Sequence, residues 1–242
     1  YDYFDGLNTG TVAILDQTKQ DGVVPGKYAN QSLSWEKVNM TNIGIDGSLF
    51  NNKLSFQIDA FNRMTNGILL TNQNLPDEAG LSGANSPSVN LASVQNKGVE
   101  LSLTHTNRIG DFNYSIGGNF SRIWNKVDYL GAYDDQINDI WINRVGVPIG
   151  TFYMWQADGL FANQEDVDNH AFQSTGTKPG DIKYKDLSGP DGTPDGLIDG
   201  YDRTVNGSDV PYITYGVNLS ARYTNFDLAV MGQGVSDLDV YL

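Results

Sequence analysis

The sequence predicts an all-β fold and, within that class, an antiparallel segment of a transmembrane β-barrel. Three stretches of this 242-residue chain alternate apolar with polar residues and reverse direction through only two to four residues. Alternation with a period of two places the apolar side chains of a strand on one face. Tight turns within each strand pair and long polar segments between pairs are the layout of a membrane barrel, which has short periplasmic turns and long extracellular loops.

The first hairpin is predicted to pair residues 33–50, interrupted near Glu36-Lys37, with residues 54–70 through the turn Asn51-Asn52-Lys53. Its apolar positions recur at every second residue on both sides of that turn, which is the period of a half-buried strand. Residues 1–32 lack this alternation and are expected to be irregular, apart from a short strand at 12–15. The first regular sheet is therefore expected to begin only after residue 32.

A polar loop at residues 71–94, containing Pro and Gly, is expected to separate the first hairpin from the second at 95–127. Residues 128–210 follow as a long acidic loop region, which the barrel interpretation places outside the cell. The last hairpin is predicted at 212–240, with its turn at Thr224-Asn225. The three turns would then all lie on the periplasmic side.

The polar face of the predicted strands is expected to line a water-filled lumen. Its residues alternate with the apolar ones and are Asn42, Asp46, Ser48, Gln57, Asp59, Glu100, Ser102, Thr104, Asn113, Ser115, Asn119, Asn218, Ser220 and Arg222. In a soluble two-layer sandwich the same residues would face bulk water. Alternation alone does not separate the two structures, and strand length and loop asymmetry favour the barrel.

The predicted strands are about 12 to 18 residues long, whereas strands of globular proteins have a usual length of about 5–6 residues. Six clear strands are too few for a large transporter barrel of about 22 strands around a plugged lumen. The open edges of such a partial sheet need partners in the membrane. The chain is therefore expected to be an internal piece of a longer mature protein, without the plug domain.

Composition excludes several classes of protein. The net charge of −14 and the pI near 4.3 argue against nucleic acid binding. The chain has no cysteine, so disulfides, thiol nucleophiles and zinc-thiolate sites are excluded. The two histidines, His105 and His170, are far apart in the sequence and have no catalytic motif around them. These observations predict that the protein is not an enzyme.

One local motif resembles a twelve-residue calcium loop. Residues 191–202 place oxygen ligands at positions 1, 3 and 5, a turn glycine at position 6, and further carboxylates at positions 9 and 12. Calcium takes six to eight hard oxygen ligands, and this spacing would wrap them around one point. The expected Ca²⁺ ligands, with a structural role, are Asp191, Thr193, Asp195, Leu197 through its carbonyl, Asp199 and Asp202. The alternative is a turn rich in Asp and Gly that holds no metal.

Several segments carry a family likeness in a fixed order. They are Leu33-Ser34-Trp35-Glu36-Lys37, then Asn42-Ile43-Gly44-Ile45-Asp46, Phe61-Asn62-Arg63-Met64-Thr65-Asn66-Gly67, Val94-Gln95-Asn96-Lys97-Gly98-Val99-Glu100, Gly180-Asp181-Ile182-Lys183-Tyr184, and Tyr215-Gly216-Val217. The order and spacing resemble the carboxy-side barrel of SusC/RagA-type TonB-dependent outer-membrane transporters across nearly the whole chain. One departure is Leu187-Ser188-Gly189-Pro190, which leaves Asp186 and Asp191 as competing first ligands of the acidic loop.

The resemblance implies energy-coupled import of oligosaccharides, or in some members peptides, across the outer membrane. It also implies a SusD-like surface lipoprotein as a lid, contact with TonB through the missing plug, and surrounding outer-membrane lipid. The runner-up function is a soluble, calcium-stabilised carbohydrate-binding β-sandwich, which would have short strands and a water-soluble monomer. A glycan hydrolase is a third alternative, but it needs a carboxylate pair positioned in space, which a sequence does not show.

Overall fold

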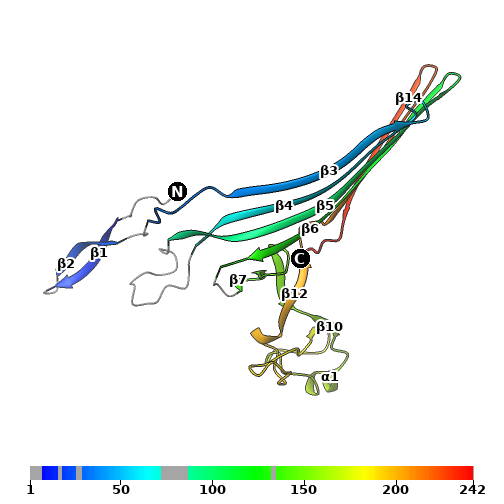
Figure 1. Cartoon of the computed structure of the whole chain (residues 1–242). Coiled ribbons are helices and arrows are strands. Elements are labelled where there is room, and N and C mark those ends of the chain that lie inside the picture. The colour runs from blue at the N-terminus through cyan, green and yellow to red at the C-terminus, as the bar shows by residue number, and fades with distance from the viewer. Residues whose placement is uncertain (1–6, 16–17, 26–28, 72–86, 132–134, 242) are drawn as a thin grey trace.

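The computed structural model describes residues 7–15, 18–25, 29–71, 87–131 and 135–241. Its largest element is a six-stranded antiparallel sheet with the strand order β14-β13-β6-β5-β4-β3. The strands are long and curved, and the three tight turns gather at one end of the sheet (Figure 1). The prediction of an antiparallel barrel segment built from three long hairpins is confirmed.

The strands of this sheet each form hydrogen bonds only with their neighbours in the strand order given above. Their bounds are β3 (Lys37–Leu49), β4 (Leu54–Thr71), β5 (Ser88–Ile109), β6 (Phe112–Tyr129), β13 (Ile213–Tyr223) and β14 (Phe226–Ser236). Strands β3 and β14 are the two free edges. The sheet is therefore an open part of a barrel wall, because a membrane barrel closes by pairing every edge.

The tight turns use left-handed backbone conformations. Gly110 has φ of 60° and opens the two-residue turn from β5 to β6, and Thr224 has φ of 51° at the β13–β14 turn. In the first turn, three consecutive residues from Phe50 to Asn52 have φ between 54° and 63°. Positive φ at these positions gives the turn a twist that matches the flanking strands.

The strand register gathers the apolar side chains on one face of the sheet. Residues directly opposite each other in a ladder share a face. One complete row across all six strands consists of Ile45, Ile58, Leu101, Phe120, Tyr215 and Gly234. Most large apolar residues of this face are exposed, and no second sheet covers them within the described ranges. This face is therefore the lipid-contacting outside of the barrel rather than the core of a sandwich.

Two predicted strand boundaries shift. β3 begins at Lys37, where the interruption near Glu36-Lys37 was expected, so residues 33–36 are not part of it, and β5 begins at Ser88, inside the segment wrongly expected to be a loop. Asn90 on β5 accepts a hydrogen bond from the Ser34 backbone N–H (2.8 Å) and donates one to the Ser34 carbonyl (2.8 Å). This side chain satisfies the Ser34 backbone in place of a strand neighbour. Residues 72–86 of the expected 71–94 loop lie outside the described residues.

Within residues 1–32, the described ranges are more regular than expected. The predicted short strand at 12–15 is part of the longer β1 (Leu7–Leu15), which pairs with β2 (Thr18–Pro25) as an antiparallel hairpin with a bulge near Thr9. Both strands mix polar residues and glycine without apolar alternation. Pairing depends more on the partner strand than on intrinsic preference, so alternation missed this hairpin.

The excursion, defined as residues 130–212 between β6 and β13, has secondary structure that the sequence analysis did not anticipate. A four-stranded sheet has the order β12-β9-β8-β7, and a second sheet pairs β10 with β11. The elements are β7 (Gln136–Asn138), β8 (Trp141–Asn143), β9 (Thr151–Trp155), β10 (Ala157–Leu160), α1 (Gln164–Asp168), β11 (Ile182–Tyr184), the 3-10 turn η3 (Gly200–Asp202) and β12 (Arg203–Ser208). These elements are too short for hydrophobic periodicity in the sequence to predict them.

Apolar side chains are buried in two parts of the described structure. In the excursion, Ile142, Phe152 and Phe161 are each almost fully buried. At the end of the sheet away from the tight turns, Val94 and Val127 pack with Ala92 and Leu130 in one core cluster. Among the described residues, the helices are all too short and polar to cross a membrane. The excursion thus buries apolar side chains of its own and also covers one end of the sheet.

Candidate functional site: the inner face and the excursion

The polar face of the sheet, opposite the lipid-contacting one, is a continuous hydrogen-bonding surface. One row across the six strands consists of Asp46, Gln57, Ser102, Asn119, Gly216 and Gln233. The register places all fourteen residues of the predicted polar face together. Neutral amides and hydroxyls dominate this inner face, so it can donate to and accept from an uncharged polar ligand.

Gly216 shows how close the packing of this inner face is. A Cβ at this position would collide with the amide oxygen of Asn119 on the neighbouring strand. The absence of a side chain at Gly216 therefore leaves space for Asn119 to project into the lumen.

A cavity of about 460 Å³ lies between the inner face and the excursion. Side chains of the sheet, polar and apolar, form one wall, and mostly apolar residues of the excursion form the other. The polar sheet residues include Arg63, Thr65, Asn96 and Asn125, and the apolar excursion residues are Pro148, Ile149, Val210 and Pro211. A concave site with an apolar wall and a few converging polar groups is the usual form of a binding pocket.

Two contacts hold the excursion against the sheet beside this cavity. The Asn125 side chain donates to Asn96 (2.8 Å) and accepts a hydrogen bond from the backbone N–H of Ile149 (2.8 Å). The backbone of Val127 accepts from Gly146 and donates to the carbonyl of Val147, both at 2.8 Å. Because these bonds involve the strand itself, the excursion wall of the cavity is fixed by the same residues that form the barrel wall.

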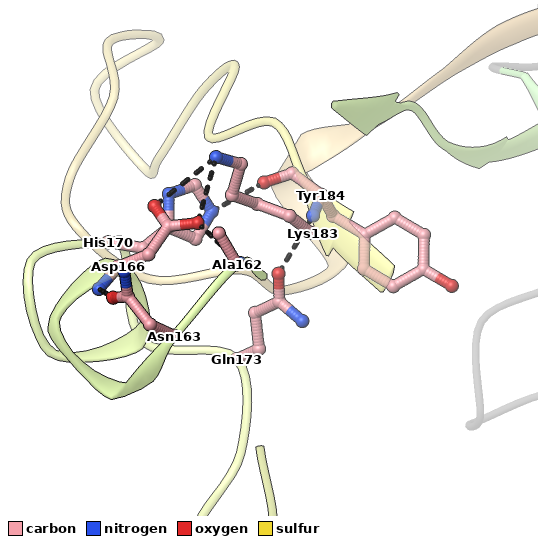
Figure 2. A network of polar contacts seen from close by, with 7 residues as sticks. All are labelled: Ala162, Asn163, Asp166, His170, Gln173, Lys183 and Tyr184. Carbon is pink, nitrogen blue, oxygen red and sulfur yellow. Dashed lines mark hydrogen bonds and ion pairs between the residues drawn. The ribbon is translucent and has the colours of Figure 1, made fainter. Parts of the chain in front are cut away.

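A polar network inside the excursion connects α1 to β11 (Figure 2). Asp166 accepts hydrogen bonds from the Ala162 N–H (3.1 Å) and from the Lys183 ammonium (3.3 Å), and these bonds hold the pKa of Asp166 below its ordinary value. The His170 ring contacts the Tyr184 carbonyl at 2.7 Å, and Gln173 accepts from the Tyr184 N–H. Each partner in the network is a backbone group or a structural ion pair, so its role is to shape the excursion.

An exposed ion pair lies nearer the sheet. The Arg144 guanidinium is 2.6 Å from the Asp135 carboxylate. The hydrogen bond to Asp135 raises the pKa of Arg144 above its ordinary value, against the opposing effect of burial. Because both side chains are more than a third exposed, solvent screens the pair and it contributes little to stability.

Asp202 is the most constrained residue of the predicted calcium loop. Its carboxylate is fully buried and accepts backbone N–H groups from Leu187 (2.7 Å), Ser188 (3.1 Å) and Asp199 (2.8 Å). Burial alone would raise the pKa of Asp202, but the three backbone hydrogen bonds, together with the Asp186 side chain, outweigh burial and hold that pKa below the ordinary value. Asp202 therefore serves as a buried anion that holds two backbone segments together, residues 187–188 and residue 199.

The other predicted ligands have separate local roles. Asp199 caps η3 through the Tyr201 N–H, and Asp195 accepts the Leu197 N–H. Asp191 and Thr193 are exposed, and Leu197 forms an isolated β-bridge with Phe172. Of the two competing first ligands, Asp186 rather than Asp191 faces the loop, because it accepts the backbone N–H groups of Asp195 and Gly196. The structure thus brings Asp186 into the loop and leaves Asp191 outside it.

These roles bear on calcium binding. Within the described ranges, no three acidic or histidine side chains are grouped so that they could hold a metal ion. Both lone pairs of one Asp202 oxygen are already used by the Leu187 and Ser188 N–H groups. The six-ligand set expected from spacing is therefore not assembled in this arrangement. Calcium binding by this loop stays a prediction.

Sequence reasoning missed the cavity and the roles of Asn125 and Asp186. Asn125 continues the inner-face alternation of β6 beyond Asn119, so its side of the sheet could have been read from the sequence. Its contact with Ile149 could not, because Ile149 lies in an excursion whose path follows from tertiary packing. The residues of the excursion wall carried no signal in the sequence.

Comparisons with known proteins agree with this geometry. A family profile described as "TonB dependent receptor-like, beta-barrel" matches residues 2–237. TonB-dependent receptor P3 of Formosa agariphila is 32% identical over 232 residues, which cover 91% of this chain and 22% of that protein. TonB-dependent receptor SusC of Bacteroides thetaiotaomicron is 25% identical over 207 residues, or 84% of this chain and 20% of that protein. The chain spans less than a quarter of the length of either relative.

Solved structures share the fold. The RagAB peptide importer in its open-open state superposes with a TM-score of 0.77 at 23% identity, covering 98% of this chain and 24% of that chain. A second structure, of the RagAB peptide transporter, gives a TM-score of 0.74 at 22% identity, with 98% of this chain and 25% of that chain covered. At this level of identity the likeness shows a common fold.

Proposed function

This outer-membrane chain belongs to the TonB-dependent receptor β-barrel family, and from that premise we propose that it forms part of the wall of a nutrient importer. The proposed activity is energy-coupled uptake of oligosaccharides or peptides by the complete receptor, driven by TonB through a plug domain supplied elsewhere in that receptor. A catalytic role is not part of the proposal. His105 lies in the apolar outer face of β5, and His170 binds a backbone carbonyl in the excursion.

One observation carries this proposal: from the tight turns to the level of Val99 and Phe120, the register gives the sheet an apolar outside and a polar inside. A solvated inner face of amides and hydroxyls offers many weak hydrogen bonds to hydroxyl or peptide groups without one deep binding site. The cavity beside Arg63, Asn96 and Asn125 lies at the end of this face away from the turns. A polar solute arriving from outside would therefore meet the cavity before the rest of the lumen.

Both substrate classes have support. The RagAB structures are described as a peptide importer or transporter, and the resemblance to SusC-type sequences implies oligosaccharides. Neutral polar side chains on the inner face suit either class, because both present hydroxyl or amide groups.

Two neighbouring positions test the assignment of the faces and the import role together. Ser102 lies on the inner face and Leu101 on the outer face of β5, and this segment contains no cysteine of its own. In the full-length receptor, we expect Ser102→Cys to react with an impermeant polyethylene-glycol maleimide and uptake then to fall severalfold. Leu101→Cys, in contact with lipid, should stay unlabelled. Labelled oligosaccharides and peptides are supplied separately, and uptake of either should require TonB.

Equal labelling at the two positions would remove the distinction between inner and outer faces. Unchanged uptake after complete labelling of Ser102→Cys would contradict a solute path along this face. Uptake that continues without TonB would indicate a passive pore instead of an importer.

We also propose that a SusD-like surface lipoprotein covers the receptor and contacts the excursion. The excursion exposes two apolar pairs, Leu160 with Ile182 and Phe172 with Leu197, which are neighbours in β ladders. Clustered exposed apolar residues in an aqueous region mark protein interaction surfaces. Replacing Leu160 and Ile182 with Ser should weaken co-purification of the lipoprotein, whereas Asp191→Ser on the exposed acidic loop should not. Equal recovery with both variants would refute contact through this pair.

A further inference from the structure

The apolar band on the outer face ends abruptly on the side away from the turns. On β6 the outer-face residues from Phe112 to Phe120 are apolar at every second position except Gly118, a stretch of nine residues. A tilted strand needs about 9–11 residues to cross the hydrocarbon core. The next outer-face residues, Arg122, Trp124 and Lys126, therefore lie at the membrane surface. Because the tight turns are periplasmic, that surface belongs to the outer leaflet.

The neighbouring strand changes at the same level. On β5 the apolar outer positions end at Val99, and the next outer residue is Lys97, directly opposite Trp124 in the ladder. Arg122 and Lys126 lie two residues to either side of Trp124, within diagonal reach of Lys97. These residues form the outer basic cluster: Lys97, Arg122 and Lys126 around Trp124.

The charges of this cluster are only partly compensated. Arg122 lies 3.8 Å from Asp237 and 5.1 Å above the Trp124 ring, and its Nε is buried without a hydrogen-bond partner. Lys126 is 3.3 Å from Asp128. Lys97 is exposed, and none of the described residues forms an ion pair with it. Three cations against two carboxylates leave a positive surface on a chain whose net charge is −14.

This placement has a physical consequence. Lys and Arg can lay their aliphatic stems along the apolar band while their charged ends reach the headgroup region. Trp is favoured at the same depth because its ring is apolar and its N–H is polar. Guanidinium and ammonium groups bind phosphate oxygens through charge-assisted hydrogen bonds. The outer basic cluster thus presents phosphate-binding groups where lipid headgroups lie.

We propose that the outer basic cluster binds the phosphate groups of a phosphorylated glycolipid in the outer leaflet. The lipid chains would lie against Val99 and Phe120 in the apolar band, and the phosphates would contact Lys97, Arg122 and Lys126. Free inorganic phosphate would gain nothing from the adjacent apolar band, so the geometry commits the site to a lipid. The proposal depends on the membrane orientation of the sheet and is independent of the imported substrate.

The experiment uses the full-length receptor in nanodiscs that contain either bis-phosphorylated lipid A or the same lipid after enzymatic dephosphorylation. Native mass spectrometry counts the lipid that stays bound. We expect retention of the phosphorylated lipid, and the variant Lys97→Gln/Arg122→Gln/Lys126→Gln should weaken it by on the order of tenfold or more. Lys97→Arg, which keeps the charge, should retain wild-type binding. The single Gln variants provide the same readout if the triple variant fails to fold.

Arg63→Gln is the matched control, because Arg63 lies at the height of this cluster but on the inner face. The proposal is overturned if the triple variant retains the lipid, or if dephosphorylated lipid binds equally well. Release by excess inorganic phosphate would indicate a free-anion site and would also overturn it. Equal loss with Arg63→Gln would show that overall charge, rather than this cluster, controls retention.

Discussion

The six-stranded sheet and the excursion place apolar side chains in opposite surroundings. On the outer face of the sheet, Ile43 is 75% exposed and Phe226 is 78% exposed. In the excursion, Ile142 and Phe152 are at most 1% exposed, although the excursion carries 14 acidic and five basic residues between positions 131 and 210. Apolar residues thus cover the outside of one region and fill the inside of the other.

The difference reflects two solvents acting on one chain. In water, burying apolar area is favourable by about 25 cal/mol per Å², which drives Phe152 and Ile142 inward. In hydrocarbon there is no such gain, and the strict requirement is that backbone polar groups be paired. The sheet meets that requirement with continuous ladders, and so its apolar side chains can remain outside.

The largest expected effect comes from placing a charged side chain on the outer face of the sheet. Val217 lies in the row of Phe56 and Leu103, near the middle of the apolar band. Val217→Arg would place a charge in hydrocarbon and should destabilise the full-length receptor by about 2–4 kcal/mol. Urea unfolding in lipid vesicles measures this loss.

The matched control for Val217→Arg is Asn218→Arg, one residue further along β13 and on the inner face. Because that side chain projects into water, the substitution should change stability by less than about 0.5 kcal/mol. Similar losses at both positions would mean that the two faces are not distinguished by solvent.

Much of this two-faced sheet follows from the sequence. Alternation of Ile43 and Ile45 with Asn42 and Asp46 predicts both the strand and its faces, because side chains alternate with a period of two. The contact just before β3 does not follow, since Asn90 reaches Ser34 across 56 positions of sequence. Local patterns thus predicted the faces, whereas this long-range side-chain contact was beyond them.

The second prediction concerns the loss of the buried Asp202 carboxylate in the excursion. Asp202→Ala would leave the N–H groups of Leu187, Ser188 and Asp199 without their buried acceptor. We expect a local destabilisation of about 1–3 kcal/mol, because an unsatisfied buried donor retains its desolvation cost. Hydrogen exchange should speed up at residues 186–203 while β5 and β6 stay protected. Exchange that rises equally in the sheet would show that the two regions do not fold separately.

The candidate site was predicted only in part. Spacing predicted a calcium loop at residues 191–202, and that stays a prediction; it gave no sign that the Asp202 carboxylate accepts backbone N–H groups. Spacing gives no information about Leu187 and Ser188 folding back onto it. The cavity beside Asn125 was beyond prediction for the same reason, because its second wall comes from a distant part of the chain.

A third prediction uses pH to separate the regions. The pKa values of Asp166 and Asp202 are lowered in the folded excursion, so both carboxylates stabilise it above the ordinary pKa of 3.8. That stability is lost as the pH falls below 3.8 and through the lowered folded values. Hydroxyl-radical footprinting should show Phe152 becoming reactive over this range, while Leu101 in lipid stays unreactive. A pH response of the same size in Asp202→Ala would exclude Asp202 as its source.

The smallest expected effect concerns calcium. No three of the described carboxylates are grouped to hold a metal ion, so calcium would have to draw together Asp186, Asp195 and Asp199, which keep carboxylate lone pairs beyond those used by backbone N–H groups. A site of the extracellular type, with a Kd of about 10⁻⁴–10⁻³ M, would gain about 0.4–1.4 kcal/mol at ~1 mM Ca²⁺.

Slower proteolysis of residues 186–202 in Ca²⁺ than in chelator measures this gain, with Mg²⁺ as the comparison ion. Asp195→Ala should abolish the protection, and Asp191→Ala should preserve it because Asp191 lies outside the turn. If cleavage is the same with Ca²⁺ and with chelator, the loop is held by its backbone hydrogen bonds alone. In that case the excursion folds as water-soluble proteins do, by burial and hydrogen bonding, and needs no ion to order its acidic residues.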